Sequence, residues 1–162
     1  MNDDLRGFYR LVQGSRERVF AWAESLPPQV YTAEHPEFAY GSLRNIQAHI
    51  ADCCLSWVGV RGLGMAENDV PSDSLRDVSA MRERFQQVDG VLGRAFDSFS
   101  ALDEPLEIQW RQGTLSVTRR WLLLHPITHE FHHKGQMLAL GRVLGHPYPP
   151  GPDTDLLLPS EV

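Results

Sequence analysis

Apolar residues recur at helical spacing along most of this 162-residue chain. From Asp3 to about Leu26 the apolar positions lie three, four or seven residues apart, which predicts an amphipathic helix. They are Leu5, Phe8, Val12, Val19 and Ala23. Acidic Asp3 and Asp4 suit its N-terminus, and Pro27-Pro28 ends it. A connection rich in proline and glycine is expected to continue to Gly41.

Two further stretches repeat this spacing. Ser42 is a good N-cap for a second helix, which the glycines at 62 and 64 end. Its inner face carries Leu43, Ile46, Ile50, Cys53, Trp57 and Val60. A third helix is expected from about Leu75 to Ser100, with Val78, Met81, Phe85, Val88, Leu92 and Phe99 on its apolar side.

The period changes to two between Leu102 and Val117, which predicts a short β-hairpin turning at Gln112-Gly113. A fourth helix is expected to begin near Ser116 or Thr118 and to run to about Leu144. Pro126 lies inside this span, so it should either kink the helix or mark its effective start.

Four amphipathic helices predict an all-α fold, an antiparallel four-helix bundle with a short hairpin between the third and fourth helices. With 42% hydrophobic and 22% charged residues, residues 1–162 are expected to form a single domain. The fourth helix has two apolar stripes. The first holds His129, His133, Met137, Leu140 and Leu144, and the second Leu124, Ile127, Phe131 and Leu138. The second stripe should pack on another element or on a second subunit, which makes a homodimer a candidate.

Charge and composition narrow the classes of partner. A net charge of -6 argues against a nucleic-acid surface, which normally carries a basic stripe. Apolar runs stay well below the roughly 20 residues that cross a membrane. Cys53 and Cys54 are neighbours and cannot join distant segments. The first residues lack the basic and apolar regions of a signal peptide. A cytoplasmic location is therefore expected.

Four of the seven histidines lie between positions 125 and 133. On a helix, His129 and His133 lie one above the other, so both can bind one divalent cation. Residues 129–133 also match the H-E-x-x-H pattern of zinc peptidases, in which Glu130 would be the general base. A downstream third ligand is missing from the expected spacing, however, and the only later glutamate is Glu161. The peptidase interpretation is therefore the weaker one.

The third ligand should come from another helix of the bundle. His49 lies on the inward face of the second helix, where the alternative is an ordinary buried histidine. Cys53, one turn later, is a fourth ligand, a nucleophile or, as we favour, a small buried apolar residue.

Four polar residues beside these histidines have two interpretations each. Asp52 and Glu130 either orient the imidazoles or are ordinary surface charges or helix-pairing charges. His132 is rotated away from the pair on the helix, so we expect it to support or pack rather than to bind metal. Gln136 can reach the open side of the site or hydrogen-bond to another helix.

Two segments carry a family resemblance. They are Asn45-Ile-Gln-Ala-His49-Ile-Ala-Asp52 and Thr128-His-Glu-Phe-His-His-Lys-Gly-Gln136. Together with the closing segment from Gly145 to Leu156, they resemble the DinB/YfiT-like metalloenzymes. The resemblance implies a four-helix bundle, frequently dimeric, that binds zinc or nickel through His49, His129 and His133. The chemistry that it implies is broad, since the family includes thiol-dependent S-transferases and a mycothiol-dependent isomerase beside many members of unknown activity.

Three histidine ligands leave coordination positions open, as in catalytic sites. A metal there could turn a thiol into a thiolate or a water into hydroxide at neutral pH. Our leading hypothesis is a metal-dependent S-transferase that joins a small-molecule thiol to an electrophile. The alternatives are a metal-dependent hydrolase and a non-catalytic, metal-stabilised module with a stress-related or assembly role.

Overall fold

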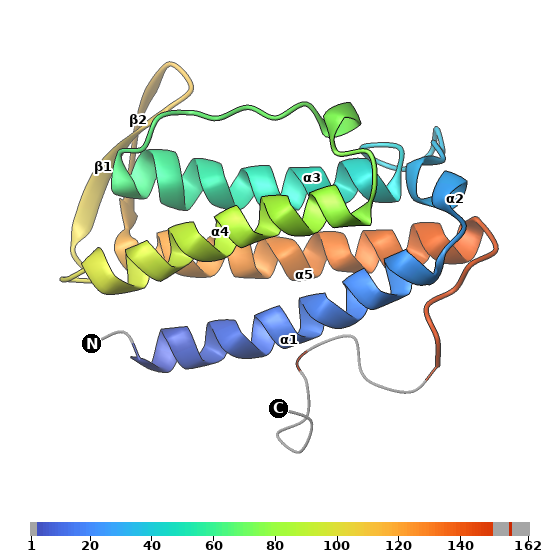
Figure 1. Ribbon diagram of the computed structural model, residues 1–162. Helices are drawn as coiled ribbons and strands as arrows, with labels where there is room; N and C mark the ends of the chain where they lie inside the picture. The colour runs from blue at the N-terminus through green and yellow to red at the C-terminus, as the bar shows by residue number, and fades with distance from the viewer. Residues whose placement is uncertain (1–2, 151–155, 157–162) are drawn as a thin grey trace.

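Four long helices form the molecule, as the computed structural model of residues 3–150 and Leu156 shows (Figure 1). They are α1 (Asp3–Ser25), α3 (Leu43–Cys54), α4 (Val78–Ser98) and α5 (Arg119–Val143). The helix α3 continues without a break as a π-helix, η1 (Leu55–Gly62). The all-α bundle with a hairpin between the third and fourth predicted helices is confirmed.

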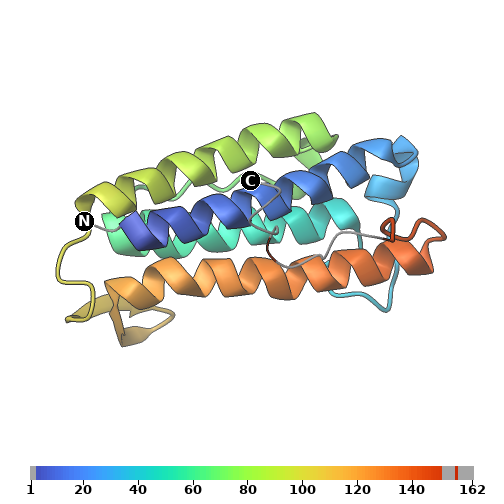
Figure 2. The ribbon, with the colours of Figure 1, turned by 90° about the horizontal axis from the view of Figure 1, so that it is seen from below.

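The directions of the helices give the bundle one long crossover. Figure 1 and Figure 2 show α1 and α5 running one way and α3 and α4 the other. The pairs α3–α5 and α1–α4 are thus antiparallel, whereas the sequence neighbours α3 and α4 are parallel. Residues 63–77, which contain the short 3-10 helix η2 (Ser72–Ser74), return along the outside of α3 to make this possible. Four-helix bundles of this kind need such a long connection.

Side-chain caps start three of the helices. Ser42 Oγ accepts a hydrogen bond from the amide of Asn45 at 3.2 Å, as predicted for the second helix. The Asp77 carboxylate caps α4 in the same way, so this helix starts at Val78 rather than near Leu75. Thr118 caps α5.

The predicted connection after α1 contains an unexpected short helix, α2 (Pro28–Thr32). Pro28 occupies its first turn, where the missing amide hydrogen costs nothing. The side chain of Tyr31 is buried, and its hydroxyl donates to Gln47 Oε1 at 2.6 Å. Packing on α3 therefore orders a segment whose local sequence predicts only a loop.

The hairpin pairs β1 (Pro105–Trp110) with β2 (Gly113–Thr118) in antiparallel register. Trp110 lies opposite Gly113, so Arg111 and Gln112 form the loop, one residue earlier than predicted. The Trp110 ring stacks on Trp57 of η1, with centroids 4.5 Å apart. This contact holds the hairpin against the end of the bundle.

Helix α5 begins at Arg119 and passes through the buried Pro126, so the proline does not mark its start. Of its two predicted apolar stripes, the first faces α3. In the second, Ile127 is buried, while Phe131 and Leu138 are half-buried against the core. The chain therefore covers part of the second stripe itself.

No helix within residues 3–150 is both long and apolar enough to cross a membrane. Glu161, the late glutamate considered for a peptidase site, lies outside the described residues, as do residues 151–155 of the closing segment.

Candidate metal centre

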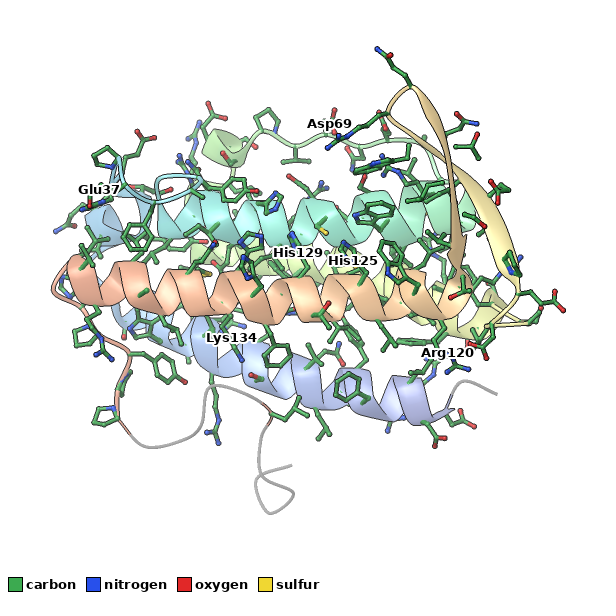
Figure 3. The ribbon with its side chains drawn as sticks, turned by 180° about the vertical axis from the view of Figure 1, so that it is seen from behind. Glu37, Asp69, Arg120, His125, His129 and Lys134 are labelled. Carbon is green, nitrogen blue, oxygen red and sulfur yellow. The ribbon has the colours of Figure 1, made fainter. Side chains whose placement is uncertain are left out.

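Three histidines meet between α3 and α5, the region in which Figure 3 labels His129. His49 comes from α3, and His129 and His133 come from successive turns of α5. The Nε2 atom of His129 lies 3.2 Å from Nε2 of His49 and 3.0 Å from Nε2 of His133. One ring nitrogen from each residue lies within 4.8 Å of the other two. The structure thus brings together the three residues that the sequence analysis selected.

The spacing of these nitrogens fits a divalent metal ion. Zinc binds histidine nitrogen at about 2.0–2.1 Å, which places two ligands of a tetrahedron about 3.3 Å apart. The two separations in the structure, 3.0 and 3.2 Å, are close to that value. The Nδ1 atom of His129 is buried without a hydrogen-bond partner among the described residues, so this ring makes its polar contacts through Nε2. This cluster can therefore hold a metal ion.

Gln136 fixes the proton on His133. Its Oε1 atom lies 2.7 Å from His133 Nδ1, and an amide oxygen can only accept a hydrogen bond. Nδ1 of His133 must therefore carry the proton, which leaves the Nε2 lone pair free for a metal. The amide nitrogen of Gln136 lies 3.3 Å from Nε2 of His132, to which it donates. His132 thus contacts Gln136 and is not one of the three clustered histidines.

Electrostatics keep the three imidazoles neutral at physiological pH. Burial lowers the pKa of His129 to about 4, and the neighbouring histidines, His133 first, add to the effect. Burial also lowers the pKa of His49 and of His133. Neutral imidazole is the form that binds metals, so each ring keeps one nitrogen with a lone pair at pH 7.

Tyr40 is a member of the site that the sequence analysis missed. Its hydroxyl lies 2.8 Å from His49 Nε2, and its ring stacks on the His49 ring with centroids 4.1 Å apart. The backbone of Tyr40 is left-handed, with φ 66°, which is costly for an aromatic residue. Two hydrogen bonds to its carbonyl oxygen, from Asn45 Nδ2 and the Ser42 amide, hold it there. No apolar periodicity marks such a loop residue.

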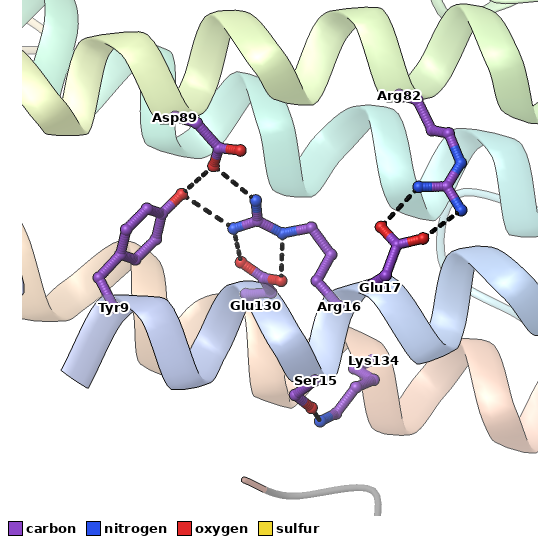
Figure 4. A network of polar contacts seen from close by, with 8 residues as sticks. All are labelled: Tyr9, Ser15, Arg16, Glu17, Arg82, Asp89, Glu130 and Lys134. Carbon is purple, nitrogen blue, oxygen red and sulfur yellow. Dashed lines mark hydrogen bonds and ion pairs between the residues drawn. The ribbon is translucent and has the colours of Figure 1, made fainter. Parts of the chain in front are cut away.

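Glu130 contacts Arg16 rather than a histidine. Both of its oxygens accept hydrogen bonds from Arg16 of α1, each at 2.8 Å, and Arg16 also contacts Asp89 of α4 (Figure 4). Of its two interpretations, helix pairing is therefore the one that the contacts support. A glutamate bound on both oxygens is also badly placed to act as the general base of a zinc peptidase.

Asp52 contacts Arg84 rather than an imidazole. Its Oδ1 atom accepts from Arg84 Nη2 at 2.9 Å. Burial lowers the pKa of His49, and the negative charge of Asp52 opposes that effect. Asp52 therefore acts on the site through its charge.

Cys53 is a protonated thiol. Burial raises its pKa to about 12, so almost none of it is thiolate at neutral pH. Because the thiolate is the reactive form, this environment favours the packing role over a nucleophilic one.

An aromatic group adjoins the cluster on the side of the hairpin. The His125 ring stacks on Trp121 with centroids 4.4 Å apart, and its centroid lies 5.9 Å from that of His129. Trp57 also packs against the His125 ring, nearly at right angles to it. His125 thus packs with tryptophans and does not join the metal cluster.

Two hollows lie beside the site, and they share residues. The first has a volume of about 490 Å³ and includes Tyr40 and His49 in its wall. The second is a cavity of about 560 Å³ between α3, η1, α4 and the crossover. Asp52 and Asp69 line both. A molecule in the cavity would thus lie next to the hollow that reaches His49.

Two buried arginines were also overlooked, and here the sequence did hold a signal. Arg16 follows Val12 by four residues on the inward stripe of α1, and Arg84 lies between Met81 and Val88 on that of α4. Both side chains are buried. A charge inside an apolar stripe requires a partner, so each position could have been marked as part of a polar network.

This chain is similar to known proteins along most of its length. The sequence model that describes the DinB family matches residues 1–158. Protein DinB of Bacillus subtilis (strain 168) is 22% identical over 154 residues, which cover 90% of this chain and 89% of that protein. The uncharacterized protein YizA of the same organism is 30% identical over 135 residues, or 80% of each chain.

Proposed function

This chain belongs to the DinB family, and we propose that it is a metal-dependent S-transferase that uses a low-molecular-weight thiol. The convergence of three neutral imidazole nitrogens from two helices carries the proposal. Three protein ligands leave at least one position for a reactant, whereas structural zinc sites use four. His49 adjoins a hollow from which a small molecule could enter.

His49, His129 and His133 would hold the metal through Nε2, and imidazole suits both zinc and nickel. The metal would supply a lowered thiol pKa, so that thiolate forms at neutral pH. Gln136 keeps the His133 lone pair directed inward. The Tyr40 ring covers His49 and narrows the approach to it.

The proposed reaction joins a thiol to an electrophilic carbon. The thiol loses its proton to solvent, and its sulfur forms a bond to that carbon. The bond from the carbon to the leaving group breaks, and the leaving group departs with the electron pair. The products are a thioether, the leaving-group anion and a proton, so no external oxidant or reductant is needed.

The contacts of Glu130 favour transfer over hydrolysis. Hydrolysis in sites of the H-E-x-x-H type uses this glutamate as general base, but here Arg16 binds both of its oxygens. A thiol needs less help than water, because its unperturbed pKa of about 8.5 is much nearer to neutrality. The hydrolase alternative is therefore less well supported.

The position of the histidines also gives the non-catalytic alternative a physical basis. A metal held by His49 and His129 would cross-link α3 to α5, the most extensive helix pair in the bundle. Such a link would stabilise the fold whether or not a reaction takes place. An assay for turnover distinguishes the S-transferase from the non-catalytic module, because only the enzyme would convert substrate.

Metal analysis of matched variants tests the ligand set. We expect about one divalent ion per chain in the wild-type protein and at least a hundredfold weaker binding in His129→Ala. His35→Ala, in the loop before α3, should keep its metal, because this ring packs on Phe38 and is not one of the three clustered histidines. Equal metal content in both variants would contradict the assignment.

A screen of thiols against electrophiles tests the activity. Cysteine, glutathione and other small thiols are combined with monobromobimane or 1-chloro-2,4-dinitrobenzene, with the His129→Ala protein as control. We expect turnover that requires both metal and thiol. If chelation lowers the melting temperature while no pair of substrates reacts, the non-catalytic alternative is correct.

A further inference from the structure

The cavity of about 560 Å³ lies under the crossover that joins η1 to α4. Figure 3 labels Asp69 in this covering segment, on the outer side of α3. The volume falls in the range of small-molecule sites, roughly 300–1,000 Å³. Neither the three histidines nor Tyr40 lines it. It is thus a separate feature that the metal centre does not explain.

Arg84 holds the crossover, residues 63–77, in place over the cavity. Its side chain is only 3% exposed, yet it reaches two other parts of the chain. Nη2 donates to Asp52 Oδ1 on α3 and to the carbonyl oxygen of Asn68 in the crossover, both at 2.9 Å. Because a buried guanidinium without partners is costly, these bonds fix the segment over the cavity. The space is therefore a built feature of the fold.

The lining favours an apolar ligand without net charge. Apolar side chains come from η1, the crossover and α4, namely Leu55, Val60, Met65 and Val91. The charges of Asp52 and Arg84 offset each other through their ion pair. The other charged groups are Arg94 on α4, which is positive, and Glu67 and Asp69 on the exposed crossover, which are negative. No single sign dominates the cavity, so it does not select an ion.

Gly90 opens the cavity on the side of α4. It lines the space, and a Cβ atom built there would have no neighbour within 4 Å. Glycine is a poor residue in the middle of a helix, so its presence there costs stability. The missing side chain leaves room for a ligand.

The cavity also adjoins the metal centre. Asp52 follows His49 by three residues on α3, a separation of about 5–6 Å between Cβ atoms. Asp52 and Asp69 line both the cavity and the hollow at His49. A ligand with one end at Asp52 therefore has that end one helical turn from a proposed metal ligand.

We propose that this cavity binds the electrophile, and that the electrophile is an apolar organic molecule without net charge. The role as a substrate site rests on the proposed S-transferase function, whereas binding in the cavity does not. The apolar body of the molecule lies against the cavity walls, and its electrophilic carbon lies at the end near Asp52. The thiol approaches through the hollow at His49.

Two glycine substitutions in one helix test the binding site. Gly90→Leu places a side chain in the cavity, and Gly93→Leu, on the same helix but outside the lining, is the matched control. A Cβ atom at either position has open space, and leucine is the better helix former. Both variants should therefore fold and melt at or above the wild-type temperature.

Binding is measured with the uncharged fluorescent probe N-phenyl-1-naphthylamine, in the absence of metal and thiol. We expect saturable binding to the wild-type protein, at least tenfold weaker binding to Gly90→Leu, and binding to Gly93→Leu within twofold of wild type. Absence of binding to the wild-type protein, or equal binding to the two variants, overturns the proposal. A tenfold preference for the anionic probe 8-anilinonaphthalene-1-sulfonate overturns the assignment of an uncharged ligand.

Kinetics with an uncharged apolar electrophile test the role in the reaction. Gly90→Leu should raise KM for 1-chloro-2,4-dinitrobenzene at least tenfold while its metal content stays at the wild-type value. An unchanged KM contradicts the substrate role. If the probe binds as expected but no thiol reacts with any electrophile, the S-transferase function fails and the binding site stands.

Discussion

At the scale of single residues, proton positions decide whether the histidines can bind a metal. A histidine nitrogen that carries a proton has no lone pair to offer. In His133 the contact from Nδ1 to Gln136 settles this, because the amide oxygen requires the proton on Nδ1. In His49 the Tyr40 hydroxyl can donate to the Nε2 lone pair that a metal would use. Gln136 thus leaves the Nε2 lone pair of His133 available to a metal, whereas Tyr40 competes with a metal for that of His49.

Gln136→Ala should weaken metal binding by roughly ten- to a hundredfold, the usual effect of removing a group that orients a ligand. The variant loses the acceptor for His133 Nδ1, so the ring can rotate or carry its proton on Nε2. Competition with a fluorescent chelator measures the affinity. Gln86→Ala, on the exposed face of α4, serves as control. Equal affinities in the two variants would show that Gln136 does not orient His133.

Acid should destabilise the metal-free protein between about pH 6.5 and pH 4. The pKa of His129 is lowered to about 4, mainly by burial, while an unfolded histidine titrates near 6.5. Below pH 6.5 the unfolded chain therefore binds protons that the folded chain still excludes, so the free energy of unfolding falls. It is highest above pH 6.5, and His129 adds no further loss below about pH 4.

Urea unfolding of the metal-free protein at a series of pH values measures this effect. His129→Gln should flatten the dependence, because glutamine does not titrate. A curve for this variant as steep as that of the wild-type protein would mean that other groups cause the acid sensitivity.

At the scale of helices, a buried polar network joins α1 to α4 and α5 (Figure 4). Arg16 donates to both oxygens of Glu130 and, at 2.7 Å, to Asp89. The hydroxyl of Tyr9 completes the group through Asp89. Because Glu130 precedes His133 by three residues on α5, Arg16 of α1 binds this helix within one turn of a candidate metal ligand.

Arg16→Leu should lower the free energy of unfolding by about 3–5 kcal/mol, the usual cost of leaving a buried charge without its partner. Arg82→Leu is the matched control. Arg82 also binds carboxylates, those of Glu17 and Glu24, but this network lies at the surface. Its loss should cost about 1 kcal/mol or less. Chemical denaturation measures both values, and similar losses would contradict the distinction between the two networks.

At the scale of the whole molecule, the order of the helices creates the cavity. Since α3 with η1 and α4 are parallel, the chain must travel back along the bundle between them. That return segment is the cover which Arg84 binds through Asn68. A short connection between antiparallel helices would leave no such cover, so the topology itself supplies the space beside the metal centre.

The second apolar stripe of α5 predicts a homodimer. The chain buries Ile127, but Leu124 and Leu138 stay partly exposed on the same line of the helix. A second copy could cover them. Sedimentation velocity should show a dimer for the wild-type protein and a monomer for Leu124→Glu. A wild-type protein that stays monomeric at high concentration would rule this interface out.

The elements could largely be predicted from the sequence, because each depends on local periodicity and caps. The ranges of α1, α3 with η1, and α5 agree with the predicted helices to within a few residues. Local sequence signals did not predict an element whose structure depends on tertiary packing. Tyr31 orders α2 by packing on α3. The start of α4, three residues later than predicted, is a different case, because the side-chain cap at Asp77 is itself a local signal.

The candidate ligands also followed from the sequence, since His129 and His133 share a helix face at any packing, and His49 lies on an inward stripe. Their convergence required the tertiary structure, because the distance between His49 and His129 depends on how α3 packs against α5. The same holds for Tyr40, for the choice of Arg16 as the partner of Glu130, and for the cavity. Periodicity specifies which face of a helix is buried, whereas contacts between distant residues depend on the direction and neighbours of each helix.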